Sequence, residues 1–135
     1  MSLFVSDVVK MGSRQLEEAG IPDHKVEAEL LYCWLKHIDR SRFFMVYGEP
    51  CDDRTMELYF DLIEKRRQHT PLQHLTSEQE FMGMTFDVRP GVLIPRMDTE
   101  VVVETAESLY AERKGEILDL CCGSGCIGEI GRAHV

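Results

Sequence analysis

The first seventy residues place apolar side chains three or four positions apart, as amphipathic helices do, and a polar capping residue precedes each run. This pattern predicts four helices joined by short loops, which together would form a small bundle. They cover about residues 6–19, 23–37, 41–45 and 53–68, and their expected caps are Ser6, Asp23, Ser41, and Asp52 or Asp53. In the second helix, Val26, Leu30, Trp34 and Ile38 lie four positions apart, so we expect them to form its buried stripe.

The pattern changes at Thr70. Prolines, glycines and short stretches of alternating apolar and polar residues fill residues 71–95, which predicts an extended linker that contains a β-hairpin. A further helix is expected over residues 99–114, capped by Asp98 and ended by Gly115. Residues 117–120 form a short apolar run that leads directly into a glycine-rich turn, and we interpret this run as a buried strand.

Two glycines, Gly123 and Gly125, follow the predicted strand and its acidic residue Asp119. Doubly wound α/β folds bind nucleotide-like cofactors at such a turn, because glycines let the backbone approach the ligand and the next helix presents free amide groups. A Gly-x-Gly pair also occurs in many ordinary turns, so both interpretations stay open on these residues alone.

Other candidate groups are interpreted as structural. Cys121, Cys122 and Cys126 crowd the turn, but the chain has no Cys-x-x-Cys pair, so buried thiols are expected rather than a metal site. His69 and His74 have no evident third partner and are interpreted as linker histidines. Three charged residues, Arg96, Asp98 and Glu100, could suggest catalytic groups, but structural roles are expected instead. Asp98 would cap the following helix, and Arg96 would form a salt bridge or anchor the linker.

Five strings in the second half of the chain are more specific than any single motif. They are Pro71-Leu72-Gln73-His74-Leu75-Thr76, Glu80-Phe81-x-Gly83-x-x-Phe86-x-Val88, Val92-Leu93-Ile94-Pro95-Arg96-x-Asp98-Thr99-Glu100, Ile117-Leu118-Asp119-Leu120 and Gly123-Ser124-Gly125-Cys126-Ile127. Together they closely resemble the protein-(glutamine-N5) methyltransferases that modify peptide chain release factors. Two strings of the helical part also fit, Gly20-Ile21-Pro22 and Glu27-Ala28-Glu29-Leu30-Leu31. The resemblance therefore covers essentially the whole chain to about Ile127.

This resemblance implies a mainly α chain with three parts. These are a helical substrate-recognition domain over residues 1–70, a hairpin linker over 71–97, and the incomplete start of a class I, Rossmann-like methyltransferase domain over 98–135. For the parent enzyme it also implies S-adenosylmethionine as the cofactor and the glutamine of the GGQ motif in a peptide chain release factor as the methyl acceptor. Cofactor binding by this incomplete chain is expected to be weak or absent. The implied cofactor-binding residues are Asp119, Cys121, Cys122, Gly123, Ser124 and Gly125.

Three positions depart from the residues usual in this family. Cys121 and Ser77 stand where glycines are usual, and Met97 stands where a proline is usual. The departures bear on the geometry of the loop and on cofactor affinity rather than on the family resemblance.

The group that performs catalysis in this family is absent from these 135 residues. A glutamine amide nitrogen is a poor nucleophile, and the family orients it with an Asn-Pro-Pro-Tyr loop. This chain has no asparagine and no Pro-Pro pair, and the part after Gly115 is shorter than the ~30 residues that one βαβ unit requires. We therefore expect an inactive fragment whose residues beyond Gly115 are frayed, or self-associate through the unpaired strand.

Charge and cysteine content narrow the function classes further. The 24 acidic and 15 basic residues give a net charge of −9, which disfavours direct binding to nucleic acid or to anionic membranes. An odd number of cysteines, five, indicates reduced thiols and a cytoplasmic location. The alternatives left open are a ribosomal-protein glutamine as the substrate and a stand-alone helical adaptor that binds protein. A nucleotide-dependent oxidoreductase is disfavoured because Cys121 breaks the Gly-x-Gly-x-x-Gly pattern.

Overall fold

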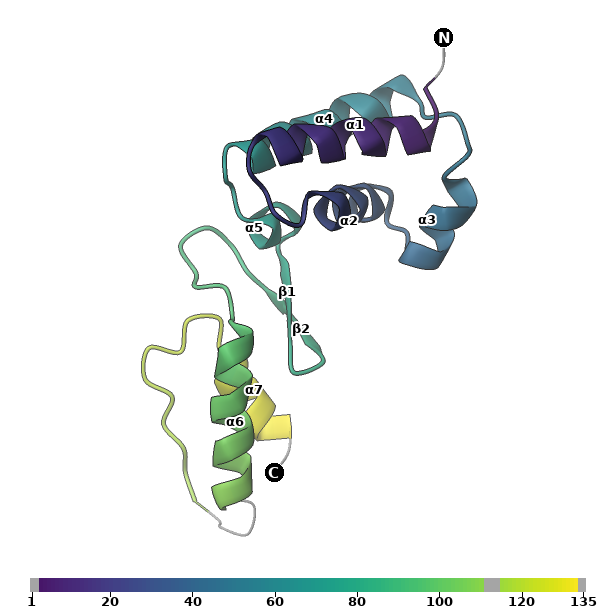
Figure 1. Ribbon diagram of the computed structural model, residues 1–135. Helices are drawn as coiled ribbons and strands as arrows, with labels where there is room; N and C mark the ends of the chain where they lie inside the picture. The colour runs from purple at the N-terminus through teal and green to yellow at the C-terminus, as the bar shows by residue number, and fades with distance from the viewer. Residues whose placement is uncertain (1–2, 111–114, 134–135) are drawn as a thin grey trace. The chain divides into compact units, whose positions relative to one another are not determined.

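The computed structural model describes residues 3–110 and 115–133, and the chain divides into two compact units, Met1–Thr76 and Ser77–Val135. Figure 1 labels the elements in each unit. Their bounds are α1 (Val5–Glu18), α2 (His24–Lys36), α3 (Arg40–Val46), α4 (Asp53–Arg67), α5 (Leu72–Thr76), β1 (Glu78–Phe81), β2 (Met84–Asp87), α6 (Met97–Tyr110) and α7 (Cys126–Ala133). This mainly helical chain with one hairpin confirms the expected fold class. Within the described ranges, no helix is long and apolar enough to cross a bilayer.

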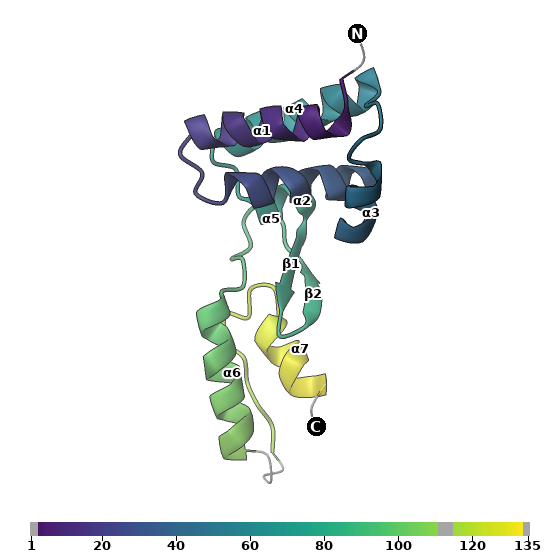
Figure 2. The ribbon, with the colours of Figure 1, turned by 45° about the vertical axis from the view of Figure 1, so that its right-hand side comes forward.

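The first unit has its core where α1, α2 and α4 pack against one another (Figures 1 and 2). Tyr59 of α4 lies at the centre, fully buried, with its ring 5.8 Å from that of Tyr32. Its hydroxyl donates a hydrogen bond to the backbone oxygen of Ala28 on α2, 3.1 Å away. Burial raises the pKa of Tyr59 far above its ordinary value, so this hydroxyl remains a donor at any physiological pH.

Two helix starts differ from the expected caps. Phe4, not Ser6, precedes α1, because the first amides of this helix bond to backbone oxygens near α3: Val5 to Glu49 and Ser6 to Tyr47. Asp39 rather than Ser41 caps α3, and its carboxylate accepts a hydrogen bond from the Arg42 amide at 2.7 Å. In both cases the backbone groups at the helix start are satisfied by a nearer or stronger acceptor than a serine hydroxyl.

The expected buried stripe of α2 is wrong for Val26 and Leu30, whereas Trp34 and Ile38 are half-buried and pack against the core. Val26 and Leu30 are each 46% exposed, whereas the buried face carries Ala28, Leu31 and Tyr32. Residues four apart advance by about 40° more than a full turn at each step, so a long four-residue series drifts around the helix. Packing of α2 against both α1 and α4 selects the neighbouring face instead.

Asp52, one of the two residues expected to cap α4, is the observed cap. Its carboxylate makes the stability of the first unit depend on pH. Its carboxylate accepts hydrogen bonds from the hydroxyl of Thr55 at 2.6 Å and from the Thr55 amide at 2.8 Å. These bonds lower the pKa of Asp52 below its ordinary value of 3.8. A folded-state pKa below the unfolded one gives stability that is present above the unfolded pKa and lost as the pH falls through the folded pKa.

We therefore expect the urea midpoint of the first unit to fall from pH 7 to about pH 3, in part through Asp52. The Asp52→Asn variant keeps a neutral acceptor and should show a smaller fall. Fluorescence of Trp34, the single tryptophan, reports this unfolding. Equal falls in both proteins would contradict this role of the carboxylate.

The second unit contains the expected hairpin. Strands β1 and β2 are antiparallel, with Glu78 opposite Asp87 and Phe81 opposite Met84. A small core joins the hairpin to α6 and α7; it consists of Phe81, Phe86, Val103, Cys126 and Ile130. The Glu100 carboxylate of α6 also accepts a hydrogen bond from the Met82 amide at the hairpin turn, 2.8 Å away.

Several expectations for the region after the bundle need correction. The linker begins with the short helix α5 rather than with an extended chain, and α6 begins at Met97, so Asp98 lies inside it and is not its cap. The expected end of this helix, residues 111–114, lies outside the described residues.

The predicted strand over residues 117–120 is absent; these residues are irregular, and the three apolar residues among them are exposed. Within the described residues, the two strands of the hairpin form the sheet, so this apolar run has no strand beside it with which to pair. Residues 126–133 are not frayed, since they form α7 in spite of Gly128 and Gly131. Burial of Cys126 and Ile130 against the hairpin core accounts for that helix.

Candidate functional site

The turn before α7 has the backbone of a ligand-binding loop. Within residues 121–125, Cys121, Gly123 and Gly125 all have positive φ, at 60°, 57° and 78°. The Gly125 amide bonds to the backbone oxygen of Cys122 at 2.8 Å and closes the turn, and the Gly125 oxygen accepts the bond from Glu129 in α7. The described part of the chain places no atom within 4 Å of where a β-carbon on either glycine would lie. The loop is therefore open to the approach of a ligand.

Asp119, two residues before this loop, has its carboxylate close to the first turn of α7. One of its carboxylate oxygens, Oδ2, is buried and has no hydrogen-bond partner among the described residues. The same oxygen would be 3.6 Å from a β-carbon on Gly128, the third residue of α7. The positive end of a helix dipole favours a carboxylate at this position. Asp119 thus offers an acceptor with free capacity next to the turn.

The three departures from the usual family residues coincide with special backbone positions. Ser77 and Cys121 both have φ of 60°, in the left-handed region that glycine adopts at little cost. Met97 is the first residue of α6, the helix position at which proline is over-represented. The fold thus explains why glycine, glycine and proline suit these positions, and why serine and cysteine are strained there.

Replacing Cys121 by glycine is therefore expected to stabilise the loop. A non-glycine residue in the left-handed conformation costs about 1–2 kcal/mol, and part of that cost should be recovered. Hydrogen exchange of the amides in residues 121–125 measures the change. Cys122→Gly is the matched control, because the φ of Cys122 is not positive and its replacement by glycine should not stabilise the loop. Equal effects of the two substitutions would contradict the strain at Cys121.

The remaining sequence candidates do not converge on one site. Cys121 and Cys122 are exposed and Cys126 is buried, so burial of all three thiols is wrong. Within the described residues, no three potential ligands are grouped as a metal ion requires. His74 lies in α5, where its Nε2 is buried without a partner among the described residues. Glu100 is held by the hairpin turn, which gives it a structural role.

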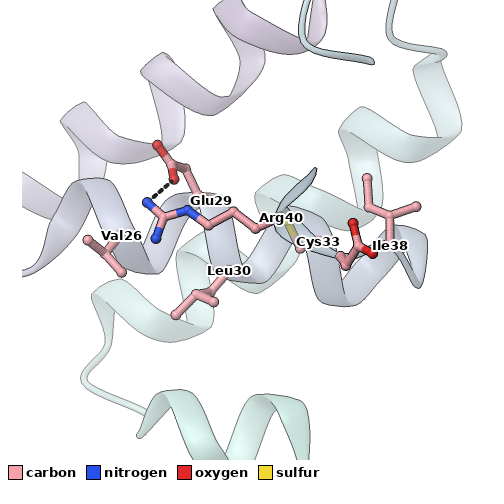
Figure 3. Close-up of a pocket in the computed structure, with 7 residues that line it drawn as sticks. Val26, Glu29, Leu30, Cys33, Ile38 and Arg40 are labelled. Atoms are coloured by element: carbon pink, nitrogen blue, oxygen red, sulfur yellow. Dashed lines mark hydrogen bonds and ion pairs between the residues drawn. The ribbon is translucent and has the colours of Figure 1, made fainter. Parts of the chain in front are cut away.

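A second candidate surface is a pocket beside α2 that sequence reasoning missed (Figure 3). It has a volume of about 190 Å³. Its lining residues are Val26, Glu29, Leu30, Cys33, Ile38, Asp39 and Arg40. Val26, Leu30 and Ile38 belong to the stripe expected in the core. The sequence pattern identified these apolar residues, but Val26 and Leu30 are exposed at the pocket instead of buried.

Charged groups border the apolar lining of this pocket. The Arg40 guanidinium reaches back to Glu29 of α2 and forms an ion pair at 3.2 Å (Figure 3). Burial raises the pKa of the Cys33 thiol, which keeps it neutral and apolar in character. Small-molecule sites usually occupy about 300–1,000 Å³, so this pocket suits one apolar side chain of a protein partner better than a cofactor.

Comparison with known proteins gives a consistent result. Residues 7–76 match the profile of the PrmC N-terminal domain family. Proteins named release factor glutamine methyltransferase align with most of the chain. Those of Clostridium botulinum, Geobacter sulfurreducens and Moorella thermoacetica are 35%, 37% and 39% identical over 93%, 83% and 84% of it. The chain spans less than half of these relatives, namely 45%, 39% and 41% of their lengths.

Proposed function

The chain belongs to the family of the PrmC N-terminal domain, and from this premise we propose that it is the N-terminal part of a release factor glutamine methyltransferase. The parent enzyme would transfer a methyl group from S-adenosylmethionine to a glutamine side-chain amide of a peptide chain release factor in the cytoplasm. The observation that carries this proposal is the family match over residues 7–76, continued by relatives of that name over 93% of the chain.

In this proposal, residues 121–125 hold the methionine end of the cofactor, and Asp119 shapes the loop beneath it. The positive φ values and the open space at Gly123 and Gly125 support this assignment. The buried Oδ2 of Asp119 supports it too, because a polar group of the ligand could satisfy that oxygen. When bound, the cofactor would supply the electrophilic methyl group, while these residues only bind and orient it.

The chain by itself is proposed to be inactive. Its 135 residues contain no asparagine and no Pro-Pro pair, so the Asn-Pro-Pro-Tyr loop implied by the resemblance is not among them. Without donors and acceptors that orient the amide nitrogen toward the methyl group, the positioning and electrostatic contributions to catalysis are lost. Weak self-association through residues 117–120 remains a prediction.

The helical unit Met1–Thr76 is proposed to contact the protein substrate. The pocket beside α2 supports this role, as do the exposed side chains of Phe44 and Met45 on α3, which are 61% and 70% exposed. Aromatic residues and methionine are enriched in protein interfaces. The same surface would serve the second candidate function, a stand-alone adaptor, and a ribosomal-protein glutamine remains the alternative substrate.

Separate titrations of the isotopically labelled chain with S-adenosylmethionine, a nicotinamide cofactor and a release factor test these roles. We expect amide shifts confined to residues 119–125 with S-adenosylmethionine, and stronger binding by Cys121→Gly. The release factor should shift residues around the pocket. Amide shifts with the release factor but not with S-adenosylmethionine would favour the adaptor. Amide shifts with the nicotinamide cofactor would contradict the methyltransferase proposal.

A paired substitution tests the pocket. Leu30→Glu places a charge in the pocket lining and should weaken binding of the release factor about tenfold. Leu58→Glu is the matched control, because Leu58 is exposed to a similar extent, 40% against 46%, but does not line the pocket. Equal affinities of the two variants for the release factor would remove the pocket from the proposed interface.

A further inference from the structure

The chain passes from the first compact unit to the second between two consecutive residues, Thr76 and Ser77. Thr76 is the last residue of α5 and Glu78 is the first residue of β1, so Ser77 alone separates this helix from this strand (Figure 1). Hydrogen bonds made within each unit show how far that unit extends along the backbone on either side of Ser77.

The backbone before Ser77 is held by the first unit. The indole Nε1 of Trp34 on α2 donates a hydrogen bond to the backbone oxygen of Thr76, 3.1 Å away. The Thr76 hydroxyl donates to the backbone oxygen of Leu72, one turn earlier in α5, at 3.3 Å. Because a peptide group is planar, a fixed Thr76 oxygen also fixes the amide nitrogen of Ser77. The first unit therefore extends to that nitrogen.

The backbone after Ser77 is held by the second unit. The Val88 amide donates a hydrogen bond to the backbone oxygen of Ser77 at 3.0 Å, and Val88 itself is fully buried. The next residue, Glu78, is paired with Asp87 in the hairpin. The peptide group after Ser77 is planar too, so it moves with the hairpin. The two backbone rotations between the fixed peptide groups are therefore φ and ψ of Ser77.

Ser77 occupies a backbone conformation that is costly for serine. Its φ is 60°, in the left-handed region that glycine adopts readily because glycine has no β-carbon. The ordinary helical value of φ is about −65°. A change from 60° to that value would turn the chain beyond this bond by about 125°. Serine at this position thus has a second backbone conformation, which a large rotation separates from the observed one.

We propose that Ser77 is a single-residue hinge, whose φ and ψ set the orientation of the first unit with respect to the second. The hinge has two conformations, one with the observed positive φ and one with a negative φ. Trp34 and Val88 anchor the backbone on its two sides and confine the rotation to this residue. The hinge does not depend on the proposed function, because it follows from hydrogen bonds within each unit.

Substitution of Ser77 in the full 135-residue chain tests the hinge. Valine is β-branched and strongly disfavours a positive φ, so Ser77→Val should adopt the conformation with a negative φ. Ser77→Gly should keep the observed conformation, since glycine adopts it at little cost. Residual dipolar couplings of the backbone amides in α1, α2 and α4, and in β1 and β2, give the orientation of each unit.

We expect Ser77→Val to change the angle between the two units by tens of degrees, and Ser77→Gly to leave it as in the unsubstituted chain. Ser77→Thr is also β-branched but keeps the hydroxyl, and it should change the angle in the same direction as valine. Fluorescence of Trp34 during urea unfolding checks that the first unit stays folded in each variant. An angle that neither β-branched variant changes would overturn the hinge.

A second left-handed residue provides the matched control. Met82, at the hairpin turn, has a φ of 48°, but both of its chain neighbours belong to the second unit. Met82→Val introduces the same strained side chain away from the connection between the units, so the angle should stay unchanged. A change as large as that in Ser77→Val would overturn the assignment of the hinge to Ser77.

Discussion

Replacing Arg66 by alanine is expected to destabilise the helical unit by about 3 kcal/mol. The Arg66 guanidinium on α4 binds both carboxylate oxygens of Glu27 on α2, at 2.5 and 3.2 Å, and also donates to the Thr70 backbone oxygen at 3.3 Å. The side chains of Arg66 and Glu27 are each 15% exposed. Loss of the arginine therefore leaves the Glu27 carboxylate largely buried without its counter-charge. Urea unfolding followed by Trp34 fluorescence measures the loss.

The neighbouring ion pair provides the control for this prediction. Lys65 binds Asp61 at 2.6 Å, but these side chains are 53% and 60% exposed, so Lys65→Ala should cost well under about 1 kcal/mol. Replacing both Glu27 and Arg66 by alanine should cost less than the sum of the two single changes, because no charge is left unpaired. Equal losses for Arg66→Ala and Lys65→Ala would show that burial does not strengthen the inner pair.

Replacing Gly12 by alanine is expected to cost about 2 kcal/mol, although alanine normally favours a helix interior. A β-carbon on Gly12 would lie within 2.8 Å of the Cε1 atom of Tyr59 and closer still to its hydroxyl oxygen. Tyr59 is fully buried and bonded to Ala28, so it has no free space into which it can move. Either the ring shifts and loses that bond, or α1 moves away from α4. Urea unfolding at pH 7 reports the loss.

Two further variants isolate the steric cause. Gly48→Ala should be nearly neutral, because nothing lies within 4 Å of its β-carbon position and its φ is not positive. Tyr59→Phe removes the oxygen atom that Gly12→Ala would meet, so the loss caused by Gly12→Ala should be smaller in that background. An undiminished loss there would refute the contact with the tyrosine hydroxyl as its main cause.

Local signals in the sequence predicted much of the helical unit. The Asp52 cap, together with glycines or prolines after three of the four apolar runs, placed four helices close to their observed bounds. The buried side of α2 could not be predicted in the same way. Val26 and Leu30 share the periodicity of core residues, and only the packing of α1 and α4 against the opposite side leaves them exposed. Periodicity identifies an amphipathic helix, whereas tertiary neighbours decide which residues are buried.

The candidate loop was located from sequence, but its surroundings were not. The glycines at 123 and 125 indicated a turn with positive φ, and both have it. The residue type at Cys121 does not indicate this conformation, and only the resemblance, which places Cys121 where a glycine is usual, pointed to it. The expected strand at 117–120 was inferred from apolar content alone. A strand requires a partner to pair with, and the described residues provide none beside it.

A methyl-transfer assay tests most directly whether these 135 residues are inactive by themselves. Purified chain is incubated with S-adenosylmethionine labelled in its methyl group and with an unmodified release factor, and the release factor is then analysed for labelled glutamine. We expect no label above that of a reaction without the chain, because the proposed cofactor loop and recognition unit are not joined in these 135 residues by the Asn-Pro-Pro-Tyr loop that the resemblance implies for orienting the acceptor amide. Labelled N5-methylglutamine in the GGQ motif, formed by these 135 residues alone, would contradict it.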